Sequence, residues 1–163
     1  MPPKYIIVAM MEKLTFTRVT GQNKDFISLV EQLNAELAII DGDDHDFYNQ
    51  YNGLEEIHHV VLLYDKDSHI ACGAIKKQND STMEIKRMYT APSFRGKGVA
   101  SKILQELEHW AAELKQKQLV LETGKRQEDA IALYTKNGYK LISNYGPYVG
   151  VENSCCFKKE LDQ

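Results

Sequence analysis

The sequence has 163 residues, of which 43% are hydrophobic and 26% charged, so it can bury the core of one domain and is not a disordered chain. Its formal net charge of −3, from 23 acidic and 20 basic residues, argues against a broad nucleic-acid-binding surface. Three cysteines without disulfide or zinc spacing, and no apolar run of roughly 20 residues, predict a cytoplasmic protein with no metal site and no membrane contact.

The chain is predicted to begin with an extension over residues 1–12, followed by a single domain over residues 13–163. Residues 14–19 alternate and are rich in β-formers, which predicts a first strand. A helix is expected from about Lys24, because apolar residues recur at steps of four, three and four at Phe26, Val30, Leu33 and Leu37.

An acidic loop over residues 41–46 ends this helix, and a short second helix is expected over residues 47–52. The loop resembles a calcium-binding loop at first sight. That motif requires glycine at its sixth place, where Asp46 stands, and glutamate at its twelfth, where Asn52 stands. We therefore predict no calcium site here.

Three strands are predicted in the middle of the chain, over residues 58–64, 69–76 and 83–89. Short polar turns join them, which indicates an antiparallel meander. Pro92 ends the third strand, because proline cannot donate a hydrogen bond to a neighbouring strand.

A glycine-bearing turn over residues 95–100 then leads into a helix with an apolar stripe at Val99, Ile103, Leu107, Trp110 and Leu114. The first N–H groups of a helix have no intrahelical partner and carry partial positive charge. Glycine lets this backbone approach a ligand closely, and Arg95 and Lys97 add full positive charges. The turn therefore predicts a cradle for a phosphate or pyrophosphate.

The remaining chain is predicted to hold a strand at 119–123, a helix at 128–137 and two antiparallel strands at 139–143 and 155–158. A crossover as long as the preceding helix favours parallel pairing of the first of these strands with the strand that contains Glu84. Acidic residues begin the helix, and Gly138 stands where a left-handed residue closes a helix.

The pattern Arg-Gly-x-Gly-x-Ala between such a strand and such a helix resembles the acetyl-CoA pyrophosphate loop of the GNAT superfamily of N-acetyltransferases. The order of elements is similar over roughly residues 14–161. The resemblance implies an α/β (α+β) fold with a mixed, mostly antiparallel central sheet, a splayed parallel strand pair and flanking helices. It also implies transfer of the acetyl group of acetyl-CoA to an amine by direct attack in a ternary complex.

By this resemblance, the backbone of the bulged strand before the loop holds the pantetheine arm, and the amides of the loop hold the pyrophosphate. Gln127 stands where the family commonly has an asparagine that touches the cofactor. The cofactor-binding residues expected on this basis are Met88, Tyr89, Thr90, Arg95, Gly96, Lys97, Gly98, Val99, Ala100, Ser101, Gln127 and Tyr134.

Two residues are catalytic candidates. Tyr134 stands where the family places a tyrosine beside the CoA sulfur, and its phenol can donate a proton to a leaving thiolate; the alternative is a core tyrosine. Glu84 stands where some members keep a carboxylate base that works through water; the alternative is a glutamate on the surface or one bonded to a neighbouring strand.

The acceptor is expected to be a small-molecule or peptide amine, and the resemblance is compatible with a homodimer. Four side chains are expected to line the acceptor slot: Tyr145, Tyr148, Asp46 and Glu122.

Three other functions are weighed against this one. A dinucleotide oxidoreductase would explain Gly96-Lys97-Gly98, but Ser101 replaces the third glycine of that fingerprint and the preceding strands do not form βαβ units. A non-catalytic acyl-CoA-binding or sensing module on the same fold stays open, because a fold does not certify turnover. A phosphate-loop NTPase is rejected, because no Gly-Lys pair is followed by serine or threonine.

Overall fold

The computed structural model of the protein describes residues 13–49 and 53–162. The predicted extension over residues 1–12 lies outside the described residues, as do residues 50–52 of the expected short second helix. The part of that helix that the structure describes belongs to α3, which spans His45–Asn49.

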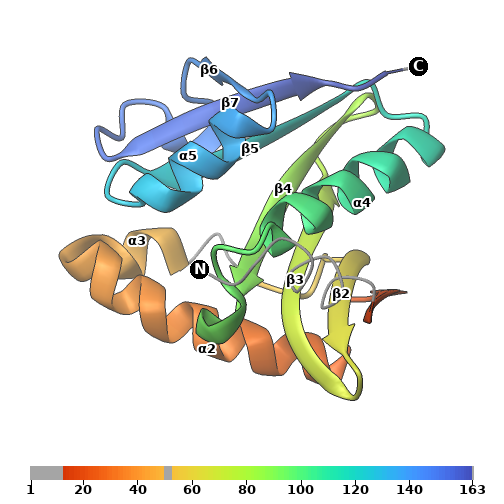
Figure 1. Cartoon of the computed structure of the whole chain (residues 1–163). Coiled ribbons are helices and arrows are strands. Elements are labelled where there is room, and N and C mark those ends of the chain that lie inside the picture. Colours follow the sequence, from red (N-terminus) through yellow and green to blue (C-terminus); the bar gives the residue numbers. More distant parts are fainter. Residues whose placement is uncertain (1–12, 50–52, 163) are drawn as a thin grey trace.

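A seven-stranded sheet in the order β1-β2-β3-β4-β5-β7-β6 forms the centre of the molecule (Figure 1). All neighbouring strands are antiparallel except β4 and β5, which are parallel. The predicted meander and the predicted parallel pair are thus confirmed. The strands span Leu14–Val19 (β1), His59–Asp65 (β2), Ser68–Lys77 (β3), Thr82–Thr90 (β4), Gln118–Gly124 (β5), Lys140–Ile142 (β6) and Ser154–Glu160 (β7).

Strand β4 is bulged and leaves its parallel partner halfway along. The register between β3 and β4 shifts between the pairs Cys72↔Tyr89 and Ala74↔Lys86, and Arg87 within the bulge has a φ of 57°. Strand β4 pairs with β5 only from Thr82 to Glu84. Beyond that point the two strands separate, as Figure 1 shows, and leave unpaired strand edges inside the molecule.

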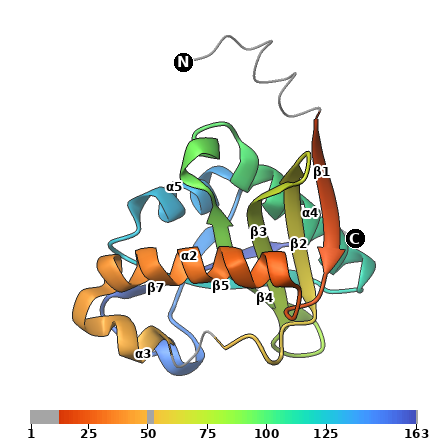
Figure 2. The ribbon, with the colours of Figure 1, turned by 90° about the horizontal axis from the view of Figure 1, so that it is seen from below.

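Helices cover both faces of the sheet. Helix α2 (Lys24–Asp41) crosses one face (Figure 2), and its first N–H groups are capped by Asn23, whose Oδ1 accepts from the amides of Asp25 and Phe26. The other face is packed by α4 (Val99–Glu113) and α5 (Glu128–Lys136). Gly138 has the left-handed φ of 88° that was predicted for it. No helix within the described ranges is long and apolar enough to cross a bilayer.

The core has two main parts, one on each side of the sheet. The side under α2 contains Phe26, Leu29, Val30 and Leu33 packed on β2 and β3. The side under α4 and α5 contains, besides strand residues, Val99, Ile103, Leu104, Leu107, Ala111, Tyr134 and Tyr139. The predicted stripe of α4 is therefore buried in its first half. Leu114 is 37% exposed instead of buried, because the helix ends at Glu113 and does not carry this residue onto the core face.

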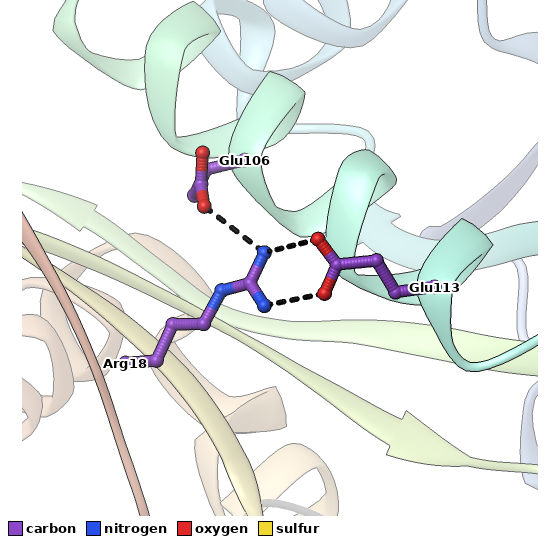
Figure 3. Close-up of polar contacts among 3 residues, drawn as sticks. All are labelled: Arg18, Glu106 and Glu113. Carbon is purple, nitrogen blue, oxygen red and sulfur yellow. Dashed lines mark hydrogen bonds and ion pairs between the residues drawn. The ribbon is translucent and has the colours of Figure 1, made fainter.

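An ion-pair cluster ties the edge strand β1 to α4 (Figure 3). Arg18 Nη1 donates to Glu113 Oε2 at 2.6 Å, and Arg18 Nη2 donates to Glu106 Oε1 at 3.1 Å. The guanidinium carbon also lies 4.6 Å from the centre of the Trp110 ring. These contacts lie on the surface, on the α4 side of the sheet.

Candidate active site

A cavity of about 880 Å³ opens where β4 and β5 separate. Its walls come from α2, β4, the loop before α4, the first turn of α4, the end of β5 and α5. The volume lies within the range of small-molecule sites. The splayed strands therefore give the chain an interior space with backbone groups at its edges.

The glycine turn ends at the mouth of this cavity. Gly96 and Gly98 both adopt left-handed backbone, with φ of 74° and 80°, and Gly98 is the N-cap residue of α4 without a side chain to cap it. Both glycines line the cavity together with Val99, Ala100 and Ser101. The first-turn N–H groups of α4 are thus available to an anion, which is what a pyrophosphate needs.

The two basic side chains of the turn already bind protein groups, although Arg95 is one of the residues that line the cavity. Arg95 Nε donates to the Thr90 carbonyl at 2.8 Å, and its Nη2 donates to Glu36 Oε1 of α2 at 2.7 Å. Lys97 Nζ donates to the Ser93 carbonyl at 2.9 Å, and Lys97 is not among the cavity-lining residues. A phosphate contact by either side chain stays a prediction. In this structure Arg95 fastens the turn to β4 and α2.

Tyr134 reaches the cavity from α5. It is 6% exposed, packs edge-on against Tyr139 with ring centres 5.8 Å apart, and lines the cavity. Among the described residues, no partner binds its hydroxyl. Burial raises the pKa of Tyr134 above its ordinary value, so the phenol stays protonated at neutral pH and can act as a proton donor.

The remaining predicted cofactor contacts lie on the same cavity. Met88, Tyr89 and Thr90 of β4 line it after the bulge, and Gln127 lines it from the N-cap position of α5. A contact that the sequence did not indicate lies close by. Asn137 Nδ2 donates to Ser101 Oγ at 3.0 Å and so joins the end of α5 to the first turn of α4.

Glu84 sits at the point where β4 and β5 part. Its side chain is 14% exposed, accepts a short hydrogen bond from the Tyr145 hydroxyl and pairs with Lys86 Nζ at 3.4 Å. The pKa of Tyr145 is raised, mainly because the residue is buried and in addition because the Glu84 carboxylate is negatively charged. The Tyr145 hydroxyl therefore stays protonated and donates the hydrogen bond. The Glu84 carboxylate thus lines the cavity but already holds two partners.

Glu122 on β5 is the second carboxylate on the splayed strands. Its Oε2 accepts from Ser154 Oγ at 2.7 Å. Burial raises the pKa of Glu122 to about 7, while Ser154 and Lys86 oppose the shift. The sequence placed Glu122 only in the slot lining, because a lone acid at a strand end carries no signal of its burial.

The expected acceptor slot is matched in part. Glu122 and Tyr148 line the cavity, whereas Asp46 is exposed on α3 and Tyr145 lies behind Glu84, and neither is among the lining residues. Residues that the sequence did not single out take part instead. They are Tyr48 of α3, Arg126 after β5, and Lys86 and Arg87 of β4; Asp41, from the acidic loop that the sequence indicated, also lines the cavity.

Comparison with known proteins decides the family. Residues 27–139 match the acetyltransferase (GNAT) family. The chain belongs to this family.

N-acetyltransferase YsnE of Bacillus subtilis (strain 168), described as uncharacterized, is 33% identical over 115 residues, which cover 67% of this chain and 76% of YsnE. IAA acetyltransferase of Azospirillum brasilense is 36% identical over 80 residues, which cover 48% of this chain and 52% of that protein. The chain thus spans about half the length of that relative.

Solved structures share the GNAT fold. A Klebsiella pneumoniae protein with a proposed acyl-CoA N-acyltransferase activity has a TM-score of 0.77 at 29% identity, over 91% of this chain and 98% of its own. A GNAT acetyltransferase from Elizabethkingia anophelis, whose structure contains acetyl-CoA, has a TM-score of 0.68 at 20% identity, over 92% of this chain and 99% of its own. The predicted fold class is confirmed.

The GNAT family uses acetyl-CoA as its acetyl donor. The residues of this GNAT protein fit that ligand, because an uncapped helix N-terminus for an anion and a buried phenol lie on one cavity with the free edge of β4.

Proposed function

We propose that the protein is an N-acetyltransferase that transfers the acetyl group of acetyl-CoA to an amine by direct attack in a ternary complex. One observation carries the proposal. The uncapped first turn of α4, Tyr134, Glu84 and Glu122 all line one cavity between the splayed strands. An anion site, a proton donor and a proton acceptor are the groups that this transfer needs.

The acceptor amine has to lose a proton before it attacks. An ordinary amine with a pKa near ~10.4 is mostly protonated at pH 7, and its neutral form costs about 4.6 kcal/mol. Glu122 is our candidate for the proton acceptor, because its pKa of about 7 suits a base that works near neutral pH. Glu84 stays the alternative base, acting through water, although Tyr145 and Lys86 already occupy its carboxylate.

As the amine nitrogen bonds to the acetyl carbon, the C–S bond of the thioester breaks and coenzyme A leaves as a thiolate, which takes up a proton. Tyr134 is the proposed donor, since it is a buried residue on the cavity whose hydroxyl stays protonated and has no partner among the described residues. Backbone N–H groups of β4 from Met88 onward, which have no partner on β5, are the proposed contacts for the pantetheine arm. The first turn of α4 is the proposed contact for the pyrophosphate.

The direct test measures binding and turnover separately. Calorimetry with acetyl-CoA, and with NAD as the comparison ligand, should show heat for acetyl-CoA alone. Thiol release with a panel of amines should then exceed release without an acceptor. Binding without thiol release for any amine would favour the non-catalytic acyl-CoA module on this fold. Heat with NAD and none with acetyl-CoA would contradict both readings.

A further inference from the structure

We propose that the acceptor is an anionic amine, such as an amino acid, whose carboxylate is bound by Arg87. The proposal rests on the N-acetyltransferase function proposed above and names the acceptor class for the same cavity. Its basis is a buried guanidinium in the cavity wall that lacks a counter-charge among the described residues.

Arg87 lies at the bulge of β4, only 6% exposed, and lines the cavity. Its Nη2 donates to Oδ1 of Asn34 on α2 in a short hydrogen bond. Its Nε–H is buried and has no hydrogen-bond partner in the described part of the chain. No carboxylate of the described residues forms an ion pair with it. The side chain is therefore held in place by α2 while one edge of its donor fork stays unused.

Such an arrangement calls for an oxyanion. Arginine stays charged in proteins, and a buried charge is costly unless it is paired. The adjacent Lys86 shows the contrast, because its ammonium group pairs with Glu84 at 3.4 Å. A guanidinium edge with parallel N–H donors matches the two oxygens of a carboxylate. A bound carboxylate would satisfy both the charge and the unused donor.

The position of Arg87 separates it from the pyrophosphate site. The uncapped N–H groups belong to the turn after Gly98, at the start of α4. Arg87 instead bonds to α2, and the next residue but one, Tyr89, packs in the core cluster under α2. Its charge thus lies on the α2 side of β4, away from the helix N-terminus that suits the phosphates.

The same cavity also holds the acids that suit the other end of such a molecule. Glu84 and Glu122 line it on β4 and β5. An amino acid at neutral pH carries an ammonium group and a carboxylate a few bonds apart. Its amine would face the carboxylates on the splayed strands while its carboxylate faces Arg87. A simple amine would leave the arginine unpaired.

The experiment compares acceptors that differ only in the acid group. For the wild-type protein, kcat/KM should be measured for amino acids and for their decarboxylated amines, such as phenylalanine with phenethylamine and lysine with cadaverine. Phenylalaninamide adds a neutral isostere, and an aminoalkylphosphonate tests whether another oxyanion serves. We expect the carboxylates to exceed the matched amines and the amide by at least about tenfold, as charge-assisted hydrogen bonds allow.

The substitution Arg87→Gln removes the charge, and Arg18→Gln is the matched control, because Arg18 lies in the surface cluster on α4 and outside the cavity. Arg87→Gln should lower kcat/KM for the acid at least about tenfold more than kcat/KM for the decarboxylated amine, and it should leave the Kd of acetyl-CoA unchanged. Arg18→Gln should change none of the three. If Arg87→Gln does not fold, the wild-type ratios decide alone.

Two results would overturn the acceptor class while the proposed function stands. One is equal turnover of acids and decarboxylated amines by the wild type. The other is a weaker Kd of acetyl-CoA in Arg87→Gln with an unchanged acid preference, which would place Arg87 on the donor. If none of the amines gave thiol release above the rate without an acceptor, the proposed function would be overturned, and the acceptor class with it.

Discussion

Tyr134 shows how burial sets the chemistry of a single side chain. Its ring packs between Tyr139 and Phe157, at 5.8 and 6.4 Å between ring centres, in the core cluster under α4 and α5. The phenolate is disfavoured there, so the pKa is raised and the hydroxyl remains a donor at all pH values near neutrality. A protonated phenol is unsuited to act as a base but suited to protonate a thiolate.

The substitution Tyr134→Phe should therefore lower kcat by up to ~10²-fold and leave the Kd of acetyl-CoA nearly unchanged. The ring, and with it the packing, is retained, so only the proton donor is lost. Tyr139→Phe is the matched control, because the Tyr139 hydroxyl donates to Glu108 at 2.9 Å and Tyr139 is not a cavity-lining residue. Equal kcat values for wild type and Tyr134→Phe would leave Tyr134 a core residue only.

Glu122 ties the chemistry of the cavity to stability. Its pKa rises from 4.5 to about 7 on folding, so between these values the folded chain holds a proton that the unfolded chain releases. The free energy of unfolding therefore falls as the pH rises through this window, by on the order of 3 kcal/mol in total. Above about pH 7 Glu122 is ionised in both states, so its destabilising contribution to the free energy of unfolding no longer changes with pH.

The substitution Glu122→Gln should consequently become more stable than wild type as the pH rises from about 4.5 to about 7. Chemical denaturation at several pH values measures the difference, which should vanish at the acid end. Glu84→Gln is the companion variant for activity. We expect Glu122→Gln to lower kcat/KM more than Glu84→Gln does. The reverse order would assign the base to Glu84, and a stability difference independent of pH would contradict the raised pKa.

At this scale the sequence predicts positions better than environments. Tyr134 could be named because it stands at a set place in a motif-bearing helix, and the structure puts it on the cavity. Arg87 could not be named as a site residue from the sequence. Its burial depends on a bulge in β4 and on a contact with Asn34 of α2, which lies 53 residues earlier in the chain. Strand alternation alone does not reveal which of two neighbouring basic residues is buried.

At the scale of elements, the turn before α4 is defined by backbone conformation. The side chains of Arg95 and Lys97 bond to Glu36 and to carbonyl groups, which leaves the amides as the open groups of the turn. A Cβ at Gly96 would meet no atom within 4 Å, so its positive φ of 74° is what requires glycine. The local conformation, more than the local charge, prepares the anion site.

The substitution Gly96→Ala tests this point. We expect a loss of stability of roughly 1–2 kcal/mol from the left-handed backbone and, because the turn relaxes away from φ of 74°, a weaker Kd of acetyl-CoA. Gly150→Ala is the control, because Gly150 has a φ of 78° with open space around it and does not line the cavity. Gly150→Ala should lose similar stability without a change in Kd. An unchanged Kd of acetyl-CoA in Gly96→Ala would mean that the conformation of this turn does not contribute to ligand binding.

Most elements could be predicted because their signals are local. Apolar spacing predicts α2 and α4, and short polar turns predict the β2–β3–β4 meander, all of which the structure contains. Ends of elements are less well determined. Leu114 fits the spacing of α4 but lies past its last turn and is exposed, since the chain leaves the helix there through Lys115 with a φ of 63°. The predicted antiparallel pairing of β6 with β7 is present, whereas the pairing of β7 with β5 is a long-range contact with no local signature.

At the scale of the whole molecule, the sheet consists of two parts joined only by the short β4–β5 pairing. Strands β1 to β4 form one part and β5, β7 and β6 the other, with three paired positions between them. Beyond Glu84, β4 still pairs with β3, but its other edge has no partner on β5, so the amides on that edge border the cavity. Such amides exchange readily unless something else binds them. A ligand in the gap would supply those partners and link the two parts.

Acetyl-CoA should therefore protect a defined set of amides from hydrogen exchange. We expect slower exchange from Arg87 to Thr90 and over the turn at 95–100, with little change in β1 and β2, which the cavity does not touch. Global stability should rise as well, by about 2.7 kcal/mol at 100 times the Kd, because only the folded state binds. Coenzyme A without the acetyl group is the control and should protect the turn in the same way. Protection spread evenly over all strands would mean that the ligand only stabilises the fold globally, and no protection at 87–90 would place it outside the gap.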